Sequence, residues 1–231
     1  HPDPAITNQE IMRDLERGVT SISLAIECSG TTGCIVTNLD QLSTALKDVR
    51  ADIAAVSLGH RGAGSGASAA ALLALWAEQQ GQPDTQKLAF NISPLRQLMR
   101  TGKIGGGIDA AMAKTAALTR VLAAKFPAAT SLDVDAQTVH EAGGSEAQEL
   151  GVLMAGAVDL LRRLDQAGLR PDDAAPQILF KLAIDANYGI GIAKIRAARR
   201  LWARVLDAMN LAHAPMKLHA VTSARMLTKY D

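Results

Sequence analysis

The feature that most restricts the fold of this chain is a regular alternation of short β-prone segments with longer helical patterns. Each β-prone segment precedes a stretch with the apolar spacing of an α-helix. The predicted strands are residues 19–26, 52–58, 87–91, 130–134, 178–184 and 216–221. Their starts lie about 33 to 48 residues apart, which suits parallel strands joined by helical crossovers and excludes tight hairpins. The pattern predicts six βα units.

The predicted helices are residues 39–49, 68–80, 108–125, 146–166 and 186–209, with a further helix at 8–17 before the first strand and a short one at 94–100. The last long helix contains the run IAKIRAARRLWA. Its apolar stripe is predicted to be Ile192, Ile195, Leu201, Trp202 and Val205, with Lys194, Arg196, Arg199, Arg200 and Arg204 on the other faces. This pattern predicts a half-buried helix with a solvated basic side.

Hydrophilic residues alternate with apolar ones in the predicted strands, which is unusual for a parallel sheet covered on both faces. These residues are Ser21, Ser23, Ser131, Asp133, Asp135, Lys181 and Asp185. In an open, doubly wound sheet such side chains would be buried in the apolar core without hydrogen-bond partners. In a closed barrel they line an interior that holds water or a ligand. We therefore expect an α/β chain of the TIM (β/α)8-type barrel class, here a segment whose outer strands are missing.

Composition excludes several classes of protein. The chain has 231 residues, is 48% hydrophobic and 20% charged, and carries a net charge of +1, so it is a globular protein without a global field for nucleic acid or membranes. The longest apolar stretch, residues 67–77, is too short to span a bilayer. No secretory signal is visible, and we expect a cytoplasmic protein that binds neither nucleic acid nor membrane.

The two cysteines, Cys28 and Cys34, lie in a loop rich in glycine and threonine. They are too few for a disulfide framework, and they lack the additional ligands that a zinc site needs. We therefore expect two free thiols and no metal site. The histidines His1, His60 and His213 are expected to be solvated.

Two glycine-rich loops could indicate a nucleotide-binding protein in place of a barrel. The sequence GAGSGA, Gly62 to Ala67, follows a predicted strand and opens a helix, so it matches the dinucleotide fingerprint G-x-G-x-x-A. Asn91, however, stands after the next strand, where that fingerprint requires an acidic residue. The second loop, Gly102 to Gly107, has no strand before it and is expected to be a connection.

Three longer blocks resemble a known family. HEAGGSEAQEL (His140 to Leu150), AKIRAARRLWARV (Ala193 to Val205) and KLHAVTSARMLTKYD (Lys217 to Asp231) are similar to consecutive blocks of the acyl-CoA mutase barrel, as in adenosylcobalamin-dependent methylmalonyl-CoA mutase. The opening 27 residues are more similar to the small subunit of the two-chain bacterial enzymes than to the large one. The resemblance implies an eight-stranded barrel whose first strand precedes His1 and whose last strand follows Asp231.

The resemblance also implies a chemistry. The family threads the pantetheine chain of an acyl-CoA along the barrel axis, which gives Ser21, Ser23 and Ser131 the role of candidate substrate-binding residues. Adenosylcobalamin lies against a separate domain whose D-x-H-x-x-G histidine binds cobalt, and that motif is absent from these 231 residues. We therefore expect residues 1–231 to form one partial mutase-like barrel domain, with no cobalamin-binding domain and no cofactor bound by this chain alone.

Compared with catalytic members of the family, this chain has lost several donors to the substrate. Gln137 and Thr138 stand where catalytic chains carry a tyrosine and a histidine, and Phe90 and Val221 stand where they carry glutamines. Phenylalanine and valine cannot donate a hydrogen bond. Two positions match: Arg100, where catalytic chains bind a carboxylate, and His219, in the family's H-C-Q-T-S block. They are the candidate catalytic residues, and Arg100 is also a substrate-binding candidate.

The resemblance and the lost donors together predict a non-catalytic small subunit that forms a heterodimer with a catalytic large subunit. That assembly, an isomerase, would hold adenosylcobalamin and the acyl-CoA substrate. Two alternatives stay open: a catalytic acyl-CoA mutase of altered specificity that uses Arg100 and His219, and a nucleotide-binding α/β protein that uses Gly62 to Ala67. For His140 and Glu141, the alternative to a role at a site is a cap region before a helix whose N-cap is Ser145, with Gln148 completing a capping box.

Overall fold

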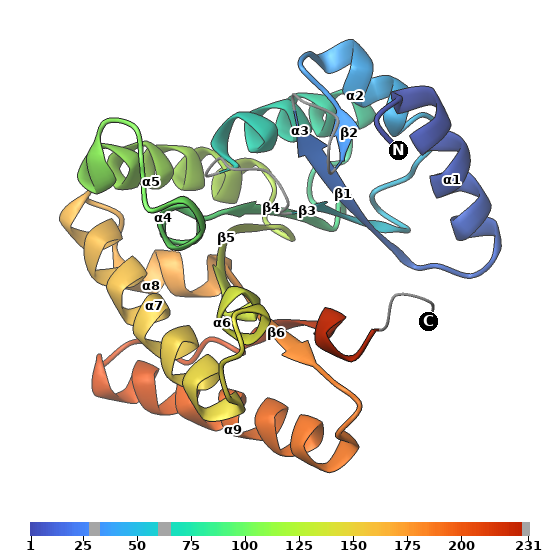
Figure 1. The fold of residues 1–231 in the computed structure, drawn as a ribbon. Helices are drawn as coiled ribbons and strands as arrows, with labels where there is room; N and C mark the ends of the chain where they lie inside the picture. Colours follow the sequence, from blue (N-terminus) through green and yellow to red (C-terminus); the bar gives the residue numbers. More distant parts are fainter. Residues whose placement is uncertain (28–32, 60–65, 228–231) are drawn as a thin grey trace. The chain divides into compact units, whose positions relative to one another are not determined.

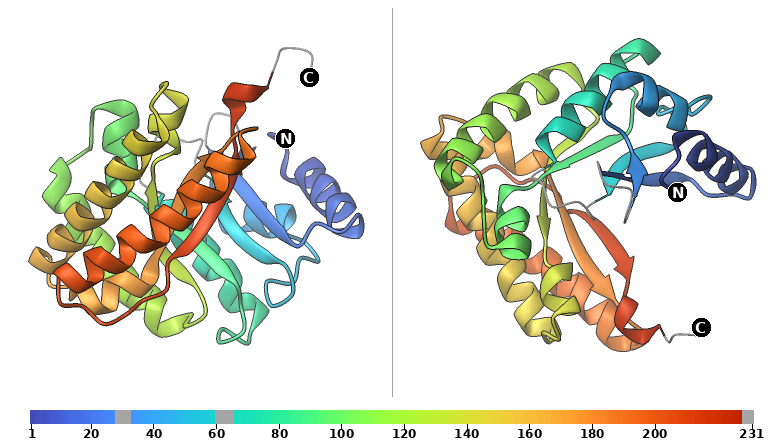
Figure 2. Two further views of the ribbon diagram at one scale, coloured as in Figure 1. Left: turned by 90° about the horizontal axis from the view of Figure 1, so that it is seen from below. Right: turned by 45° about the horizontal axis from the view of Figure 1, so that its top comes forward.

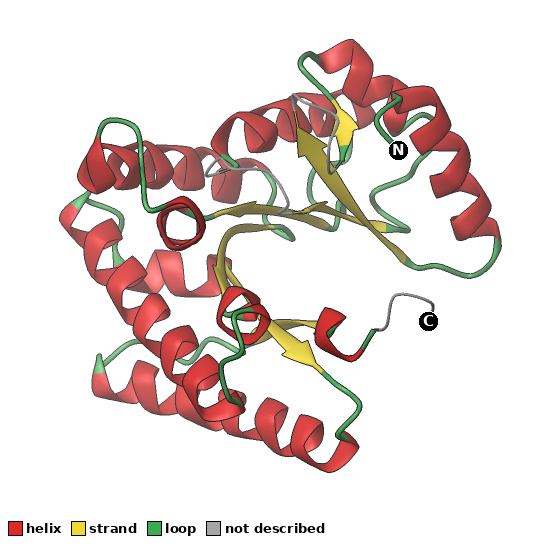
Figure 3. Ribbon diagram, in the orientation of Figure 1, coloured by secondary structure: helices red, strands yellow, loops and turns green. Residues whose placement is uncertain are grey.

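The computed structural model describes residues 1–27, 33–59 and 66–227. Its strands are β1 (Ser21–Glu27), β2 (Cys34–Ile35), β3 (Ala55–Gly59), β4 (Leu88–Ile92), β5 (Thr130–Asp135), β6 (Ile178–Ile184) and β7 (Lys217–Thr222). Its α-helices are α1 (Pro4–Glu16), α2 (Leu39–Ala45), α3 (Ala67–Gln80), α4 (Pro94–Thr101), α5 (Gly107–Lys125), α6 (Gln137–Glu141), α7 (Glu146–Gln166), α8 (Pro171–Ala174) and α9 (Tyr188–Ala208). Two 3-10 helices, η1 (Ala175–Gln177) and η2 (Ala224–Met226), complete the elements (Figures 1 and 3).

The strands form one sheet in the order β2-β1-β3-β4-β5-β6-β7. The pairs β1–β2, β1–β3, β3–β4, β4–β5 and β6–β7 are all parallel. From β1 and β3 onward, each strand lies beside the next strand of the chain, whereas a doubly wound sheet reverses its order at a switch point. This sequential order with helical crossovers is that of a partial (β/α)8-type barrel, as predicted. The two-residue strand β2 was not predicted.

The chain divides into two compact units, residues 1–93 with 117–132 and residues 94–116 with 133–231. The first unit has a continuous apolar core in which Val56, Leu73 and Phe90 are almost fully buried. The rings of Phe90 and Phe126 pack with centroids 5.7 Å apart. Cys34 is a buried free thiol in β2, outside the predicted loop, and Cys28 lies outside the described residues.

In the second unit, α7 and α9 run side by side (Figure 2). Trp202 of α9 packs against Phe180 of β6 with ring centroids 4.8 Å apart, and its indole nitrogen donates to the carbonyl oxygen of Ala214 at 3.0 Å. The helix-facing side of β6 therefore carries Phe180. Because side chains alternate along a strand, Lys181 and Ala183 lie on the opposite side.

Helix α7 begins as predicted. The Ser145 hydroxyl accepts a hydrogen bond from the backbone nitrogen of Gln148, and the Gln148 side chain accepts one from the Ser145 nitrogen. This capping box satisfies two backbone donors at the first turn. Residues 140 and 141, which we expected to be part of a cap region, instead end the short helix α6, with His140 buried and Glu141 exposed.

The predicted orientation of the basic helix is partly wrong. Arg196, Arg199, Arg200 and Arg204 are exposed as expected, but Ile192 and Leu201 are exposed too. Lys194 is buried. The buried stripe of α9 is instead Gly191, Lys194, Ala198, Trp202 and Leu206. The cause is a buried carboxylate, described below, that neutralises the ammonium group of Lys194.

Candidate functional site: a charged face and a buried polar cluster

In the second unit, the side of β5, β6 and β7 that faces away from Phe180 and Trp202 carries charged groups. Lys181 of β6 lies beside His219 of β7 in the parallel register. On β5, Val134 contacts α7 at Gly156, so Asp133 and Asp135 lie on the other side of that strand. We call Asp133, Asp135, Lys181 and His219 the charged face.

One member of the charged face, Asp133, forms a buried ion pair with Arg96. Arg96, in the first turn of α4, donates from Nη1 to both carboxylate oxygens of Asp133, at 2.8 and 2.6 Å. Both side chains are almost completely buried. Hydrogen bonds between ionised partners are the strong ones in proteins, so these two charges neutralise each other and hold the start of α4 against β5.

The second pair, Asp135 and Lys181, is looser. Nζ of Lys181 lies 3.9 Å from Oδ2 of Asp135, which is too long for a hydrogen bond. Burial raises the pKa of the Asp135 carboxyl, although the positive charge of Lys181 opposes the shift. Burial lowers the pKa of the Lys181 ammonium, and the two nearby aspartates oppose that shift. Both directions follow from the cost of burying a charge.

His219 and Arg100, the two candidate catalytic residues, lie in this same unit. His219 is half-buried, and its pKa is lowered by burial and by the neighbouring charge of Lys181. Arg100 is exposed near the end of α4, and its positive charge helps to lower the pKa of Lys181. Val221 follows His219 on the same side of β7 and pairs with Ala183.

The first unit carries a separate row of small polar residues. Ser23 pairs with Ser57 in the register of β1 and β3, and Nδ2 of Asn91 donates to Oγ of Ser57 at 2.8 Å. Ser21 and Ser23 are exposed, whereas Ser131 is fully buried. Phe90 packs in the core against Phe126, so the position that we compared with a substrate-binding glutamine lies among apolar side chains.

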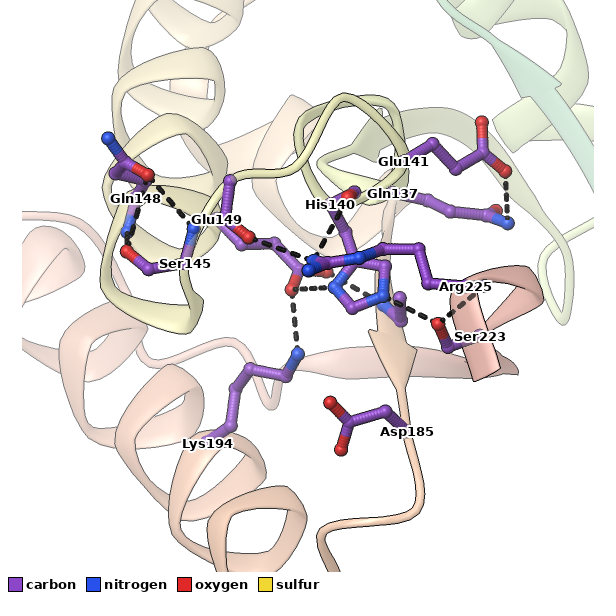
Figure 4. A network of polar contacts seen from close by, with 12 residues as sticks. Gln137, His140, Glu141, Ser145, Gln148, Glu149, Asp185, Lys194, Ser223 and Arg225 are labelled. Atoms are coloured by element: carbon purple, nitrogen blue, oxygen red, sulfur yellow. Dashed lines mark hydrogen bonds and ion pairs between the residues drawn. The ribbon is translucent and has the colours of Figure 1, made fainter. Parts of the chain in front are cut away.

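A second polar cluster, which sequence reasoning did not find, lies between α6, α7, α9 and the end of β7 (Figure 4). Glu149 is fully buried in α7. One of its oxygens accepts from the backbone nitrogen of Ala183 at 2.7 Å, and the other accepts from Nζ of Lys194 at 2.6 Å. The sequence hinted at this cluster only through a lysine within an apolar helical pattern.

His140 connects this carboxylate to Ser223 (Figure 4). Its Nε2 lies 2.6 Å from Oγ of Ser223, and its Nδ1 lies 3.7 Å from Oε2 of Glu149. Ser223 Oγ also accepts from the backbone nitrogen of Arg225 at 3.1 Å. Which atom of the His140–Ser223 contact donates depends on the histidine tautomer, and Nδ1 has no hydrogen-bond partner among the described residues. Ser223 is fully buried, so this serine, histidine and glutamate form an internal polar cluster and not an exposed nucleophile.

The Arg225 side chain completes this cluster. Its Nη1 donates to the carbonyl oxygens of His140 and Gly144, at 3.3 and 3.2 Å. The segment after β7 is thereby tied to both ends of the α6–α7 connection.

Comparison with known proteins identifies the family of this chain. The family model for methylmalonyl-CoA mutase matches residues 3–231. The chain belongs to the methylmalonyl-CoA mutase family. Among curated relatives, the small subunit of methylmalonyl-CoA mutase from Streptomyces virginiae is 40% identical over 99% of this chain and 36% of the relative. The probable small subunit from Mycobacterium tuberculosis is 33% identical over 98% of this chain and 35% of the relative.

The large subunit from Streptomyces virginiae is also related to this mutase-family chain, at 32% identity over 70% of this chain and 22% of the relative. The chain thus spans about a third of the length of the small subunits that it matches.

The remaining predicted site residues of this mutase-family chain are dispersed. Gln137 and Thr138 form the start of α6, and Gln137 donates to the Glu141 carboxylate at 2.9 Å. Of the loop from Gly62 to Ala67, residues 62–65 lie outside the described residues, and Gly66 is the N-cap of α3. His1 and His213 are exposed, and His60 is not among the described residues.

Within residues 1–27, 33–59 and 66–227, no group of three potential metal-ligating side chains occurs. None of the helices in those ranges is both long and apolar enough to cross a membrane.

Proposed function

We propose that this chain belongs to a small, non-catalytic subunit of methylmalonyl-CoA mutase. In this role it supports a catalytic large subunit that interconverts methylmalonyl-CoA and succinyl-CoA. The observation that carries the proposal is the similarity itself: the match to the Streptomyces virginiae small subunit exceeds the match to the large subunit of that organism in both identity and coverage.

The contacts of three side chains support a non-catalytic role. A catalytic barrel needs hydrogen-bond donors directed at the substrate thioester and carboxylate. Here the Arg96 guanidinium is hydrogen-bonded to the Asp133 carboxylate. Phe90 is packed in the core of the first unit, and Gln137 is bonded to Glu141. Arg96 and Gln137 are thus bonded to carboxylates of this chain, and Phe90 offers no hydrogen-bond donor.

Adenosylcobalamin belongs, in this proposal, to the assembled enzyme. The D-x-H-x-x-G motif that the family uses to ligate cobalt is absent from the 231 residues, so the residues of this chain do not fit the cofactor. Residues 1–231 are proposed to form one partial barrel domain of a cytoplasmic heterodimer. The acyl-CoA substrate is bound by the assembly.

The test is reconstitution with the large subunit of the source organism. We expect the chain to co-elute with the large subunit in size-exclusion chromatography. We also expect adenosylcobalamin binding, followed by its absorption spectrum, and conversion of methylmalonyl-CoA only when the large subunit is present. Turnover by the isolated chain would contradict the proposal and favour a mutase of altered specificity that uses Arg100 and His219. Failure of the chain to co-elute with the large subunit would contradict the proposed role as a subunit.

A further inference from the structure

Helix α9, drawn in orange at the bottom of Figure 1, carries an exposed row of side chains along its length. Tyr188, Ile192, Arg196, Arg200 and Arg204 follow one another at intervals of four residues, and all five are exposed. Residues four apart are neighbours on a helix surface and form a ridge. We call these five residues the α9 ridge. Its first two members are large and mainly apolar, and its last three are arginines.

The arginines of the α9 ridge differ from an arginine of the neighbouring helix α7. There, Arg163 forms an ion pair with Asp159 at 2.9 Å. The guanidinium groups of the ridge, and that of Arg199 beside it, form no hydrogen bond or ion pair with any residue that the structure describes. Asp207 is the one acidic residue of α9. Four arginines against one aspartate leave this surface positively charged.

The other end of the ridge is apolar and open to solvent. Tyr188 is 80% exposed and Ile192 is 43% exposed, whereas the buried stripe of α9 packs inside the second unit. Tyrosine and arginine are both enriched in protein–protein interfaces. A nucleic-acid backbone would pair with the arginines but would leave Tyr188 and Ile192 without apolar contacts. The pattern of the whole ridge therefore fits a protein surface.

We propose that the α9 ridge docks an acidic helix of the large subunit, an inference that rests on the function proposed above. Carboxylates of that helix would complement Arg196, Arg200 and Arg204, because the planar guanidinium pairs with carboxylates through two hydrogen bonds. Acidic residues are favoured near the N-terminus of a helix, and the arginines occupy the C-terminal half of α9. The two helices therefore run antiparallel, with apolar residues of the partner against Tyr188 and Ile192.

The test compares the Kd of the chain and of its variants for the large subunit, measured by isothermal titration calorimetry. We expect Arg196→Glu with Arg200→Glu to bind roughly tenfold more weakly or worse, because two attractive pairings become repulsive. The difference should shrink in about 1 M salt, where the Debye length is only about 3 Å. Arg196→Lys with Arg200→Lys keeps both charges and should retain most of the affinity. Circular dichroism should be unchanged in both variants, because both side chains are exposed.

The matched control is Arg17→Glu with Lys47→Glu, which changes the net charge equally at exposed positions of the first unit. It is expected to bind like the unmodified chain, and an equal loss in this control would overturn the inference. Ile192→Ser should weaken binding at both salt concentrations.

The outcomes separate this inference from the function on which it rests. If the unmodified chain does not bind the large subunit, the proposed function fails and the docking surface with it. If the unmodified chain binds and the charge-reversed variant binds as tightly, only the docking surface is overturned. That second result, combined with loss of binding to phosphatidylserine vesicles in the charge-reversed variant, would assign the α9 ridge to an anionic membrane in place of a protein.

Discussion

At the scale of single residues, the carboxylate of Glu149 links helix α7 to β6 and α9. It is fully buried and accepts hydrogen bonds from Ala183 and Lys194. We expect Glu149→Gln to lower the free energy of unfolding by about 3–5 kcal/mol, the usual cost of removing one partner of a buried ion pair. Chemical denaturation monitored by circular dichroism measures the change.

The matched control is Arg199→Ala on the same helix as Lys194. Arg199 is exposed, so a change within about 0.5 kcal/mol is expected. The double variant Glu149→Gln with Lys194→Met leaves no uncompensated charge and should recover part of the lost stability. If Glu149→Gln alone behaves like the Arg199 control, the ion pair contributes nothing to the fold.

At the scale of elements, the first turn of α7 offers a clean test of local stability. The Ser145 hydroxyl and the Gln148 side chain form a reciprocal cap. Ser145→Ala removes one half of it and should cost about 1 kcal/mol, seen as a lower urea midpoint with an unchanged m-value. Ser68→Ala, at an exposed position in the first turn of α3, is the control. A midpoint shift for Ser68→Ala as large as that for Ser145→Ala would mean that the cap is not responsible.

The elements also show what the sequence can and cannot predict. All six longer strands and the capped helix α7 were predicted, because long apolar patterns and capping residues are local signals. Strand β2 and helices α6 and α8 are only 2, 5 and 4 residues long. Such short elements show no repeating pattern of apolar residues in the sequence. The burial of Lys194 was missed because its partner, Glu149, lies 45 residues earlier in the chain, and only the tertiary fold brings them together.

At the scale of the whole molecule, the charged face predicts an unusual dependence of stability on pH. The folded-state pKa of Lys181 lies below its ordinary value of 10.5, so the unfolded chain binds more protons between the two values. The free energy of unfolding should therefore rise with pH through that alkaline window. In Lys181→Met this contribution is absent, and stability measured by denaturant titration at several pH values should rise less steeply. Parallel profiles for the two proteins would show that Lys181 titrates normally.

The tie between η2 and helix α6 bears on the order in which the chain folds during its synthesis. Ser223 follows His140 by 83 residues. A ribosome that adds roughly 5–20 residues per second needs about 4–17 seconds for that interval. During this time His140 of α6 lacks its contact with Ser223. A premature stop before Ser223 would leave that helix without its anchor, although every residue of the helix itself had been translated.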